Sequence, residues 1–387
     1  MKIRSNRIYT EKGIKNGSLI ISEGVIHNIV NESEEGEDYQ DYIILPGIID
    51  THNHGAMGYT LVEKCDNKRD EILGFLNGVA AQGVTSVFPT PSLDYFEDIV
   101  KISTEKHDGA DIVGIHSEGP YLSRVGENGV AEEPEVVDTK VIQKMIDDGQ
   151  GLLKLVAIAP ELPNAQEAID LLVKNGIRVA YAHSDMNYKE AYHAFNHGVT
   201  VATHTANVMS GIHHREMGGL GACLLHPGVE CELIPDGLHV STEMMELMFK
   251  VKPYDRWILV SDTTSTSGAP KGRYRFGKHI VLVDDNGFAK TETGRLMGST
   301  QPVLYGMKVL HNELGIPLEI ISQMASSNPA KVYGIDDRKG VLATGKDADF
   351  IVIDDDFNLI ATYVKGQKVY DSKEGKDYFN PNFEKLK

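Results

Sequence analysis

The chain has 387 residues, of which 41% are hydrophobic and 24% are charged. This composition is typical of globular proteins and excludes a disordered, collagen-like or membrane-spanning chain. The 38 Lys and Arg residues are outnumbered by 56 Asp and Glu residues, which gives a formal net charge of −18. Because nonspecific nucleic-acid binding depends on clustered cations that contact phosphates, we expect no nucleic-acid partner. The length fits one large barrel with an accessory layer.

Cysteine usage and hydropathy indicate the compartment. Cys65, Cys223 and Cys231 are scattered along the chain, which excludes a disulfide framework or a thiolate zinc site and favours a reducing compartment. The first ten residues lack the apolar run of a signal peptide. No stretch approaches the roughly 18 uninterrupted apolar residues of a membrane span. We therefore expect a cytoplasmic protein with no membrane partner.

Short apolar runs recur along the middle of the chain and predict strands. They lie at 43–50, 84–90, 111–119, 153–160, 177–184, 199–205, 231–237 and 257–262. Amphipathic stretches such as DEILGFLNGVAAQG and AQEAIDLLVKNG separate most of them. This alternation favours a parallel sheet that is buried on both faces. Eight such units predict an α/β fold of the (β/α)8 TIM-barrel type, which we assign to residues 46–334.

The two ends of the chain have a different pattern. Residues 1–45 and 335–387 contain short alternating strands separated by turns, with no long apolar helix. Because chain termini often lie close together, these two ends are predicted to pair into a small β-sandwich domain beside the barrel.

Metal-ligand residue types fall where the predicted strands end. They are His52, His54, Glu118, His183, His204 and Asp262. In a barrel the C-terminal strand ends converge on one mouth, so these side chains can meet although they are far apart in sequence. Histidine and carboxylate ligands suit a borderline divalent metal such as zinc or iron.

The histidine pair at the first strand end strengthens this interpretation. Residues two apart on a strand point to the same side, so His52 and His54 can share one ion. A single histidine at a strand end is more often a hydrogen-bonded polar residue than a ligand, and the chain contains 15 histidines. Six ligand-type residues at five separate strand ends are much harder to explain by chance, and they predict a metal site.

Several segments carry a resemblance to known enzymes. PGIIDTHNHG (46–55) resembles the opening signature of the amidohydrolase superfamily. Six further segments resemble the N-acetylglucosamine-6-phosphate deacetylase family. In chain order they are GIHSEGPYL (114–122), AHSD (182–185), THTANVMSGIHHRE (203–216), PDGLHV (235–240), VSDTT (260–264) and MGST (297–300). The segment 328–354 is similar to the sandwich-forming end of many amidohydrolases.

The resemblance implies how the predicted ligands divide between metal ions. Glu118 would bridge, with His183 and His204 holding one metal. His52, His54 and Asp262 would surround a second. Either one or two ions are compatible with this set, with zinc as the first choice and iron, manganese or cobalt as alternatives. The resemblance also implies a homodimer.

The implied reaction is hydrolysis of the N-acetyl amide of an N-acetylhexosamine 6-phosphate. The products are acetate and the amino-sugar phosphate. A bound divalent metal lowers the pKa of water from 15.7 toward about 7 and polarises a carbonyl oxygen. Asp262 would act as the general acid and base, taking the proton of the attacking water and delivering it to the amine. N-acetylglucosamine 6-phosphate is the first substrate choice and N-acetylgalactosamine 6-phosphate the second.

Substrate contacts are also implied by the resemblance. Arg215 would bind the phosphate through paired hydrogen bonds, with His214 beside it. The remaining contacts would come from Asn207, the backbone of Val208, His239, Leu296, Met297, Gly298 and Ser299.

One departure from the family pattern leaves the sugar and the acyl group open. The deacetylases usually carry a substrate-binding histidine shortly after EGPYL. No histidine occurs here between His116 and His183, and Ala131 lies about where that residue is expected.

Four alternative interpretations remain to be compared with this one. Other amidohydrolases bridge their metals with a carboxylated lysine at the end of the fourth strand, but the one candidate, Lys154, lies near the start of its predicted strand. A cyclic-amide hydrolase would not need Arg215, and an inactive scaffold would typically have lost metal ligands. Residues 340–347 mimic a phosphate-binding GxxxxGK loop, but Asp347 replaces the required Ser or Thr and no helix is predicted to follow.

Overall fold

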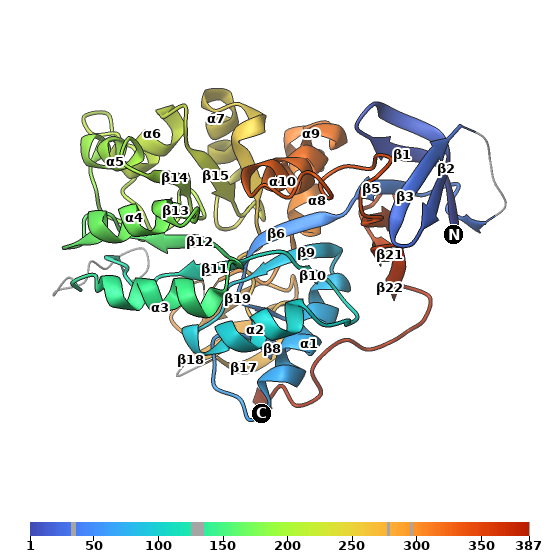
Figure 1. The fold of residues 1–387 in the computed structure, drawn as a ribbon, viewed down its shortest axis with the longest axis horizontal. Helices are drawn as coiled ribbons and strands as arrows, with labels where there is room; N and C mark the ends of the chain where they lie inside the picture. The colour runs from blue at the N-terminus through green and yellow to red at the C-terminus, as the bar shows by residue number, and fades with distance from the viewer. Residues whose placement is uncertain (32–35, 125–134, 277–278, 295, 297, 387) are drawn as a thin grey trace.

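The protein has an α/β fold in which a curled parallel sheet is covered by helices, with a second sheet beside it (Figure 1). This computed structural model describes residues 1–31, 36–124, 135–276, 279–294, 296 and 298–386. Both chain ends contribute to the second sheet, which lies to one side of the helix-covered part.

The strands of the curled sheet all run parallel to their neighbours. They pair in the orders β10-β9-β6 and β11-β12-β13-β14-β15-β16. Their bounds are β6 Ile48–Asn53, β9 Val84–Pro89, β10 Asp111–Ile112, β11 Ile115–Glu118, β12 Leu153–Ile158, β13 Arg178–Tyr181, β14 Val199–Ala202, β15 Glu230–Leu233 and β16 Trp257–Leu259. Each of the eight predicted apolar runs overlaps at least one of these strands, and the run at 111–119 is divided between β10 and β11.

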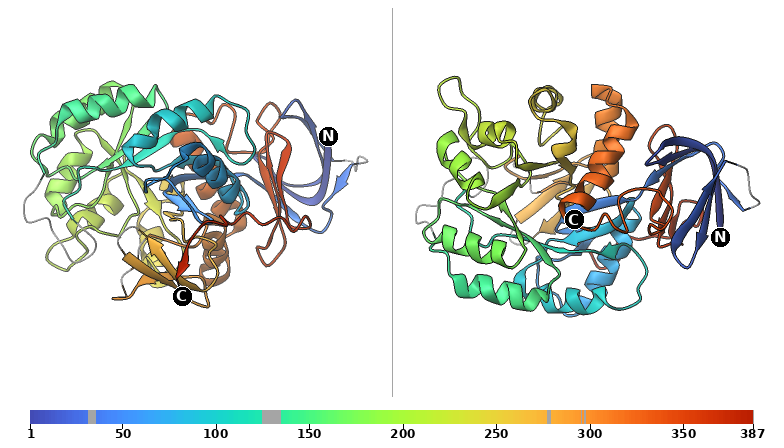
Figure 2. Two further views of the ribbon diagram at one scale, coloured as in Figure 1. Left: turned by 90° about the horizontal axis from the view of Figure 1, so that it is seen from below. Right: turned by 45° about the horizontal axis from the view of Figure 1, so that its top comes forward.

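Helices follow most of these strands and lie on the outside of the sheet (Figure 2). Their bounds are α1 Lys68–Ala80, α2 Phe96–Ser103, α3 Thr139–Gly149, α4 Ala165–Lys174, α5 Tyr188–Phe195, α6 Gly218–Leu225, α7 Thr242–Val251, α8 Val303–Leu314, α9 Leu318–Ser322 and α10 Asn328–Val332. Local sequence explains where several begin. Asn187 and Glu190 form a reciprocal capping box at the start of α5, and Ser241 caps α7. Among the described residues, no helix has the length and apolar character needed to cross a membrane.

The second sheet, which we call the terminal sheet, joins the two ends of the chain. Its strands are β1 Lys2–Thr10, β2 Gly13–Ser22, β3 Val25–Val30, β4 Glu37–Asp38, β5 Ile43–Pro46, β20 Phe350–Ile353, β21 Leu359–Val364 and β22 Gln367–Asp371. Antiparallel pairing of β5 with β20 makes the connection, for example between Ile44 and Val352. The terminal sheet encloses its own apolar cluster, which includes Ile8 and Phe350.

The predicted strand at 43–50 is therefore wrong in one respect, because the structure divides it at Gly47. Residues 43–46 form β5 in the terminal sheet, whereas β6 starts the parallel sheet at Ile48. A Cβ atom at position 47 would lie 2.0 Å from Oγ1 of Thr85, so only glycine fits where the chain passes between the sheets. The run is largely apolar, apart from Asp50, because β5 and the start of β6 are both buried.

The structure also contains a small antiparallel sheet that the sequence did not reveal. It consists of β17 Gly272–Phe276, β18 His279–Val283, β19 Ala289–Thr291 and the C-terminal strand β23 Lys385–Leu386, in the order β19-β18-β17-β23. The C-terminal segment returns to this sheet past a short hairpin of β7 Gly55–Ala56 and β8 Tyr59–Thr60 (Figure 2). Phe383 stacks on Tyr274 with ring centroids 5.2 Å apart, which anchors the returning segment.

Candidate active site

Six side chains from five strand ends meet at one end of the parallel sheet. His52 lies in β6 and His54 directly after it, and Glu118 is the last residue of β11. His183, His204 and Asp262 follow β13, β14 and β16 by two or three residues. None of the six side chains is more than 17% exposed. The structure thus brings together all six predicted ligands, as expected where the carboxyl ends of parallel strands converge. We call these six side chains the metal cluster.

Glu118 lies between two pairs of histidines. Its Oε1 atom is 3.1 Å from Nε2 of His183 and 2.9 Å from Nε2 of His204. Its Oε2 atom is 3.1 Å from Nε2 of His54 and 3.8 Å from Nε2 of His52. Each carboxylate oxygen therefore faces a different histidine pair, which is the geometry that a carboxylate bridging two metal ions requires.

Asp262 completes the half of the site formed by His52 and His54. Its Oδ1 atom lies 3.5 Å from Nε2 of His52 and 3.4 Å from Nε2 of His54. The backbone N–H of Asp262 donates to the carbonyl oxygen of His52 at 2.9 Å, so β6 and the end of β16 hold the two side chains together.

Hydrogen bonds outside the cluster direct histidine lone pairs into it. The Nδ1–H of His54 donates to the carbonyl oxygen of Thr90 at 2.8 Å, and that of His183 donates to the carbonyl oxygen of Arg124 at 3.0 Å. A carbonyl oxygen only accepts, so the Nε2 atoms of the neutral rings carry lone pairs.

Each of these lone pairs points toward the Nε2 atom of a second histidine. The Nε2 atoms of His52 and His54 are 3.2 Å apart, as are those of His183 and His204. A divalent cation satisfies this arrangement, and His52, His54 and Glu118 form one group that can hold an ion while Glu118, His183 and His204 form another. The residues present therefore fit a His/Glu metal centre.

Backbone conformation marks the same residues. His183, His204 and Asp262 have positive φ angles of 47°, 30° and 50°. Residues other than glycine adopt this left-handed backbone conformation only at an energetic cost, and residues that do so concentrate at functional sites. In each case the turn immediately follows a strand and directs the side chain into the cluster.

The cluster shifts the pKa values of its members in opposite directions. Burial by itself would raise the pKa of Glu118, but the surrounding histidines hold it well below its usual range. Burial also opposes ionisation of Asp262, yet His52 and His54 lower its pKa to about 2. Burial lowers the pKa of His54, but Asp262 and Glu118 outweigh this effect and raise it to about 9. The cluster thus favours negative carboxylates beside positive charge, as a cation site does.

Several predicted substrate contacts lie beside Asp262. The backbone N–H of Ser299 donates to the carbonyl oxygen of Asp262 at 2.8 Å. Gly298 has a φ angle of +63°, and a Cβ atom there would lie 2.7 Å from Thr264. His239 is held by Asp236, whose Oδ2 atom accepts from its Nδ1–H at 2.7 Å and lies 3.4 Å from the Ser299 hydroxyl. Asp236 is a residue that the sequence analysis missed, although it stands three positions before His239.

Asn207 and Val208 lie beside His204. The backbone N–H of Asn207 donates to the carbonyl oxygen of His204 at 2.9 Å, and its side-chain amide donates to the same oxygen at 3.1 Å. Val208 has a φ angle of 50°, so the chain turns sharply directly after these contacts.

The structure does not bring His214 and Arg215 to the metal cluster. Both are exposed, and the Arg215 guanidinium lies 2.6 Å from Nε2 of His214 within its own loop. A pair of backbone hydrogen bonds between His213 and Glu216 closes that loop. In the described part of the chain, no hydrogen bond or ion pair joins Arg215 to the six clustered side chains. Leu296 forms an isolated bridge with Lys290, whereas Met297 and Ala131 lie outside the described residues.

The carboxylated-lysine alternative has no support in the geometry. Lys154 is the second residue of β12, at the opposite end of the strand from Ile158. The metal cluster lies at the carboxyl ends of the strands, so Glu118 occupies the bridging place instead.

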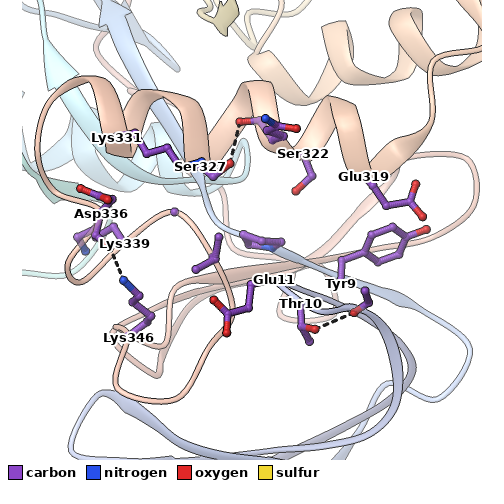
Figure 3. Close-up of a pocket in the computed structure, with 15 residues that line it drawn as sticks. Tyr9, Thr10, Glu11, Glu319, Ser322, Ser327, Lys331, Asp336, Lys339 and Lys346 are labelled. Atoms are coloured by element: carbon purple, nitrogen blue, oxygen red, sulfur yellow. Dashed lines mark hydrogen bonds between the residues drawn. The ribbon is translucent and has the colours of Figure 1, made fainter. Parts of the chain in front are cut away.

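A separate cavity of about 590 Å³ lies between the terminal sheet and the helices α9 and α10 (Figure 3). Its charged lining is mixed, with Glu11, Glu319, Asp336, Lys331, Lys339 and Lys346. The Lys346 ammonium donates to the carbonyl oxygens of Asp336 and Asp337. The GxxxxGK segment ends here, and β20 rather than a helix follows it. The segment therefore lacks the helix N-terminus of a phosphate loop.

Comparison with known proteins agrees with the fold and the site. The amidohydrolase family model matches residues 43–369. An N-acetylglucosamine-6-phosphate deacetylase of Vibrio furnissii is 34% identical over 88% of both chains. An N-acetylgalactosamine-6-phosphate deacetylase of Escherichia coli O157:H7 is 31% identical over 94% of this chain and 98% of its own. The crystal structure of an N-acetylglucosamine-6-phosphate deacetylase from Pasteurella multocida superposes with a TM-score of 0.83, at 28% identity over 95% of this chain and 98% of that one.

These matches identify the family of the chain. The chain belongs to the amidohydrolase family and, within it, to the N-acetylglucosamine-6-phosphate deacetylase family. The resemblance carried by the histidine and carboxylate motifs is thereby confirmed over most of the chain.

Proposed function

We propose that this protein is a metal-dependent deacetylase that hydrolyses the N-acetyl amide of an N-acetylhexosamine 6-phosphate to acetate and the amino-sugar phosphate. The observation that carries the proposal is the placement of Glu118, whose two oxygens face the histidine pairs His183/His204 and His52/His54. Relatives named for this activity cover most of the chain and support the substrate class.

The six clustered side chains hold one or two divalent ions in this proposal, with zinc as the first choice. Glu118, His183 and His204 would hold one ion, and His52, His54 and Asp262 would surround the other. When bound, such an ion supplies an acidified water and a Lewis acid for the acetyl carbonyl oxygen. Asp262 accepts the proton of the attacking water on a carboxylate oxygen and then delivers it to the departing amine nitrogen. General acid–base catalysis of this kind accelerates a reaction by about 10²–10⁴-fold.

The loops around the cluster bind the sugar phosphate. Arg215 and His214 take the phosphate, since a guanidinium matches phosphate oxygens through paired hydrogen bonds. The sugar contacts come from Asn207, Val208, His239, Leu296, Met297, Gly298 and Ser299. Several of these adjoin Asp262 or His204, which supports their place beside the reacting amide.

The proposed fold is a closed (β/α)8 barrel of residues 46–334, with a β-sandwich predicted for residues 1–45 and 335–387, from which the C-terminal strand β23 departs to pair with β17. Closure is supported by a parallel bridge between Asn53, the last residue of β6, and Thr263, which follows β16; β6 and β16 lie at the two edges of the curled sheet. The separate apolar cluster of the terminal sheet supports the sandwich. We further propose a cytoplasmic homodimer, and the three free cysteines agree with a reducing compartment.

A second substrate remains a candidate on a specific observation. The E. coli O157:H7 relative is named for N-acetylgalactosamine 6-phosphate, and its identity of 31% is close to the 34% of the V. furnissii enzyme. The inactive-scaffold alternative is disfavoured, because all six ligand-type side chains are present and gathered together.

Acetate release across a panel of N-acyl hexosamines, with and without a 6-phosphate, tests the proposal. We expect release from one of the two N-acetylhexosamine 6-phosphates and a much lower kcat/KM for the sugar without phosphate. Equal kcat/KM for the sugar with and without phosphate would show that the substrate assignment is wrong.

A further inference from the structure

A second layer of buried polar side chains lies directly beneath the metal cluster. Glu232 in β15, His116 in β11 and Thr51 in β6 are polar residues of the parallel strands, and all three are fully buried. Polar atoms of Glu232, His116 and His52 lie within 4.8 Å of one another. Burying a charged group without a partner is costly, so a carboxylate at this depth requires a physical reason.

Hydrogen bonds fix where the protons of this layer are. Nδ1 of His116 lies 3.1 Å from the carbonyl oxygen of Thr51, so this nitrogen carries the proton of the neutral ring. The hydroxyl of Thr51 donates to Oε1 of Glu232 at 3.1 Å. One oxygen of Glu232 is thereby partnered, and the carboxylate is held in place from the β6 side.

The other oxygen of Glu232 faces a metal-ligand candidate. Oε2 of Glu232 lies 3.5 Å from Nδ1 of His52. Within the described residues, neither atom has a hydrogen-bond partner at shorter range, and both are completely buried. The other ring nitrogen of His52, Nε2, points into the cluster, 3.2 Å from Nε2 of His54.

An imidazole that offers Nε2 to a metal must carry its proton on Nδ1. His54 and His183 secure that tautomer by donating to backbone carbonyls. For His52, Glu232 occupies the place that a carbonyl occupies for the other two. A carboxylate that accepts from the far nitrogen of a ligand also makes the imidazole more basic and fixes the orientation of its ring.

We propose that Glu232 is a positioning residue of the metal centre, which holds His52 in the tautomer and orientation that present Nε2 to an ion. The proposal rests on the proposed function only in that the cluster binds metal. It makes the His52/His54 half of the site dependent on Glu232, whereas in the other half His183 is already held by its own hydrogen bond to the carbonyl oxygen of Arg124.

Cobalt(II) titration of the metal-free protein tests the proposal without using activity. The full chain is compared with Glu232→Gln and with the control Glu230→Gln. Glu230 lies two residues earlier in the same strand, is also buried and pairs with Arg256 at 2.7 Å. Visible absorption reports the coordination of each bound ion, metal analysis reports the stoichiometry, and thermal unfolding confirms that each variant is folded.

We expect the wild type and Glu230→Gln to bind two cobalt ions with the same affinities. In Glu232→Gln one of the two steps should weaken by about 10–100-fold with an altered absorption spectrum, while the other step is retained. Unchanged affinities and spectra for both steps in Glu232→Gln would overturn the proposal. Loss of a third equivalent in that variant would also overturn it, because Glu232 would then be a ligand of a separate ion.

Failure of the proposed function gives a different result. A wild-type protein that binds no cobalt would contradict both the metal centre and the role of Glu232. A wild type that binds two ions, together with a Glu232→Gln variant that does the same, would contradict the role of Glu232 alone.

Discussion

Two clusters of buried charge lie at opposite ends of the parallel strands, and they are neutralised in different ways. At the carboxyl ends, Glu118 and Asp262 face four imidazoles whose Nε2 atoms approach one another. At the amino ends, the buried ammonium of Lys339 lies 2.9 Å from Asp111, 3.0 Å from Asp347 and 2.5 Å from Asp349. We call the second cluster the basal ion network.

The basal ion network is complete within the protein. Lys365 also pairs with Asp111 at 2.9 Å, and Arg338 pairs with Asp347 at 3.1 Å. Three cations thus face three carboxylates, and they connect the start of β10 with the segment that leads into β20. The metal cluster has two carboxylates and no Lys or Arg among its six members. The basal ion network is neutralised by the protein's own cations, and we therefore assign it to fold stability. The six clustered side chains lack such cations, and we assign them to metal binding and catalysis.

We expect the largest effect from a substitution of the proposed general acid and base, which should abolish most of the activity without lowering the stability of the fold. Asp262→Asn should lower kcat by about 10²–10⁴-fold, because an amide cannot accept the proton of the attacking water. Acetate release under saturating substrate measures this loss. The melting temperature should stay within a few degrees of the wild type, and near-normal turnover would remove Asp262 from the mechanism.

A substitution in the basal ion network should lower the stability of the fold and leave the catalytic activity unchanged. Lys339→Met strands the buried carboxylates of Asp111 and Asp349, and breaking a buried ion pair in this way costs about 3–5 kcal/mol. We expect a clearly lower denaturation midpoint in urea, with kcat/KM of the remaining folded protein unchanged. An unaltered midpoint would show that the basal ion network contributes little to stability.

The phosphate contact lies in neither cluster and should give a smaller effect. Arg215 is exposed in its loop, and a hydrogen bond to a charged group contributes about 1.5–3 kcal/mol. Arg215→Ala should therefore lower kcat/KM for the 6-phosphate substrate by about 10–100-fold, mainly through KM. Activity on the unphosphorylated sugar is the control, and an equal loss on both substrates would contradict phosphate binding by Arg215.

The smallest effect is a pH dependence that distinguishes the basal ion network from a neutral core. Burial alone would raise the pKa of Asp111, but Lys339 and Lys365 lower it below its usual value. A carboxyl whose folded pKa is depressed contributes stability above the unfolded value of about 3.9, and this stability is lost as the pH falls through the folded pKa.

Burial already raises the pKa of Asp349 in the wild type, although Lys339 opposes this effect. Removing the ammonium in Lys339→Met should therefore raise the pKa of Asp349 further and also raise that of Asp111. The variant should therefore lose most stability at neutral pH and recover part of it in acid. We expect the difference in unfolding free energy between the two proteins to narrow by about 1–2 kcal/mol between pH 7 and pH 4, measured by urea denaturation. A difference that is constant over this range would contradict the assigned charges.

The sequence was sufficient to predict the parallel strands and the clustering of six residues, because both follow from regular patterns. Apolar runs of four to eight residues indicate buried strands, and polar ligand types directly after them stand out against that background. His183 and His204 could be identified because the strands before them contain few polar residues.

Other features depend on contacts that a linear pattern does not carry. Glu232 lies inside an apolar run, so it reads as an exception within a strand until Thr51 and His52 are seen beside it. The sheet of β17–β19 and β23 joins segments more than 90 residues apart through short strands of mixed polarity. The division at Gly47 was hidden because β5 and the first residues of β6 form one largely apolar and buried run in the sequence.

Anomalous X-ray diffraction from crystals grown with zinc tests the central claim most directly. We expect a peak within about 2.0–2.2 Å of the ligand atoms of His183, His204 and Glu118. Where a second ion binds, we expect another peak beside His52 and His54. Absence of any peak at the six side chains, in protein that still releases acetate from an N-acetylhexosamine 6-phosphate, would contradict it.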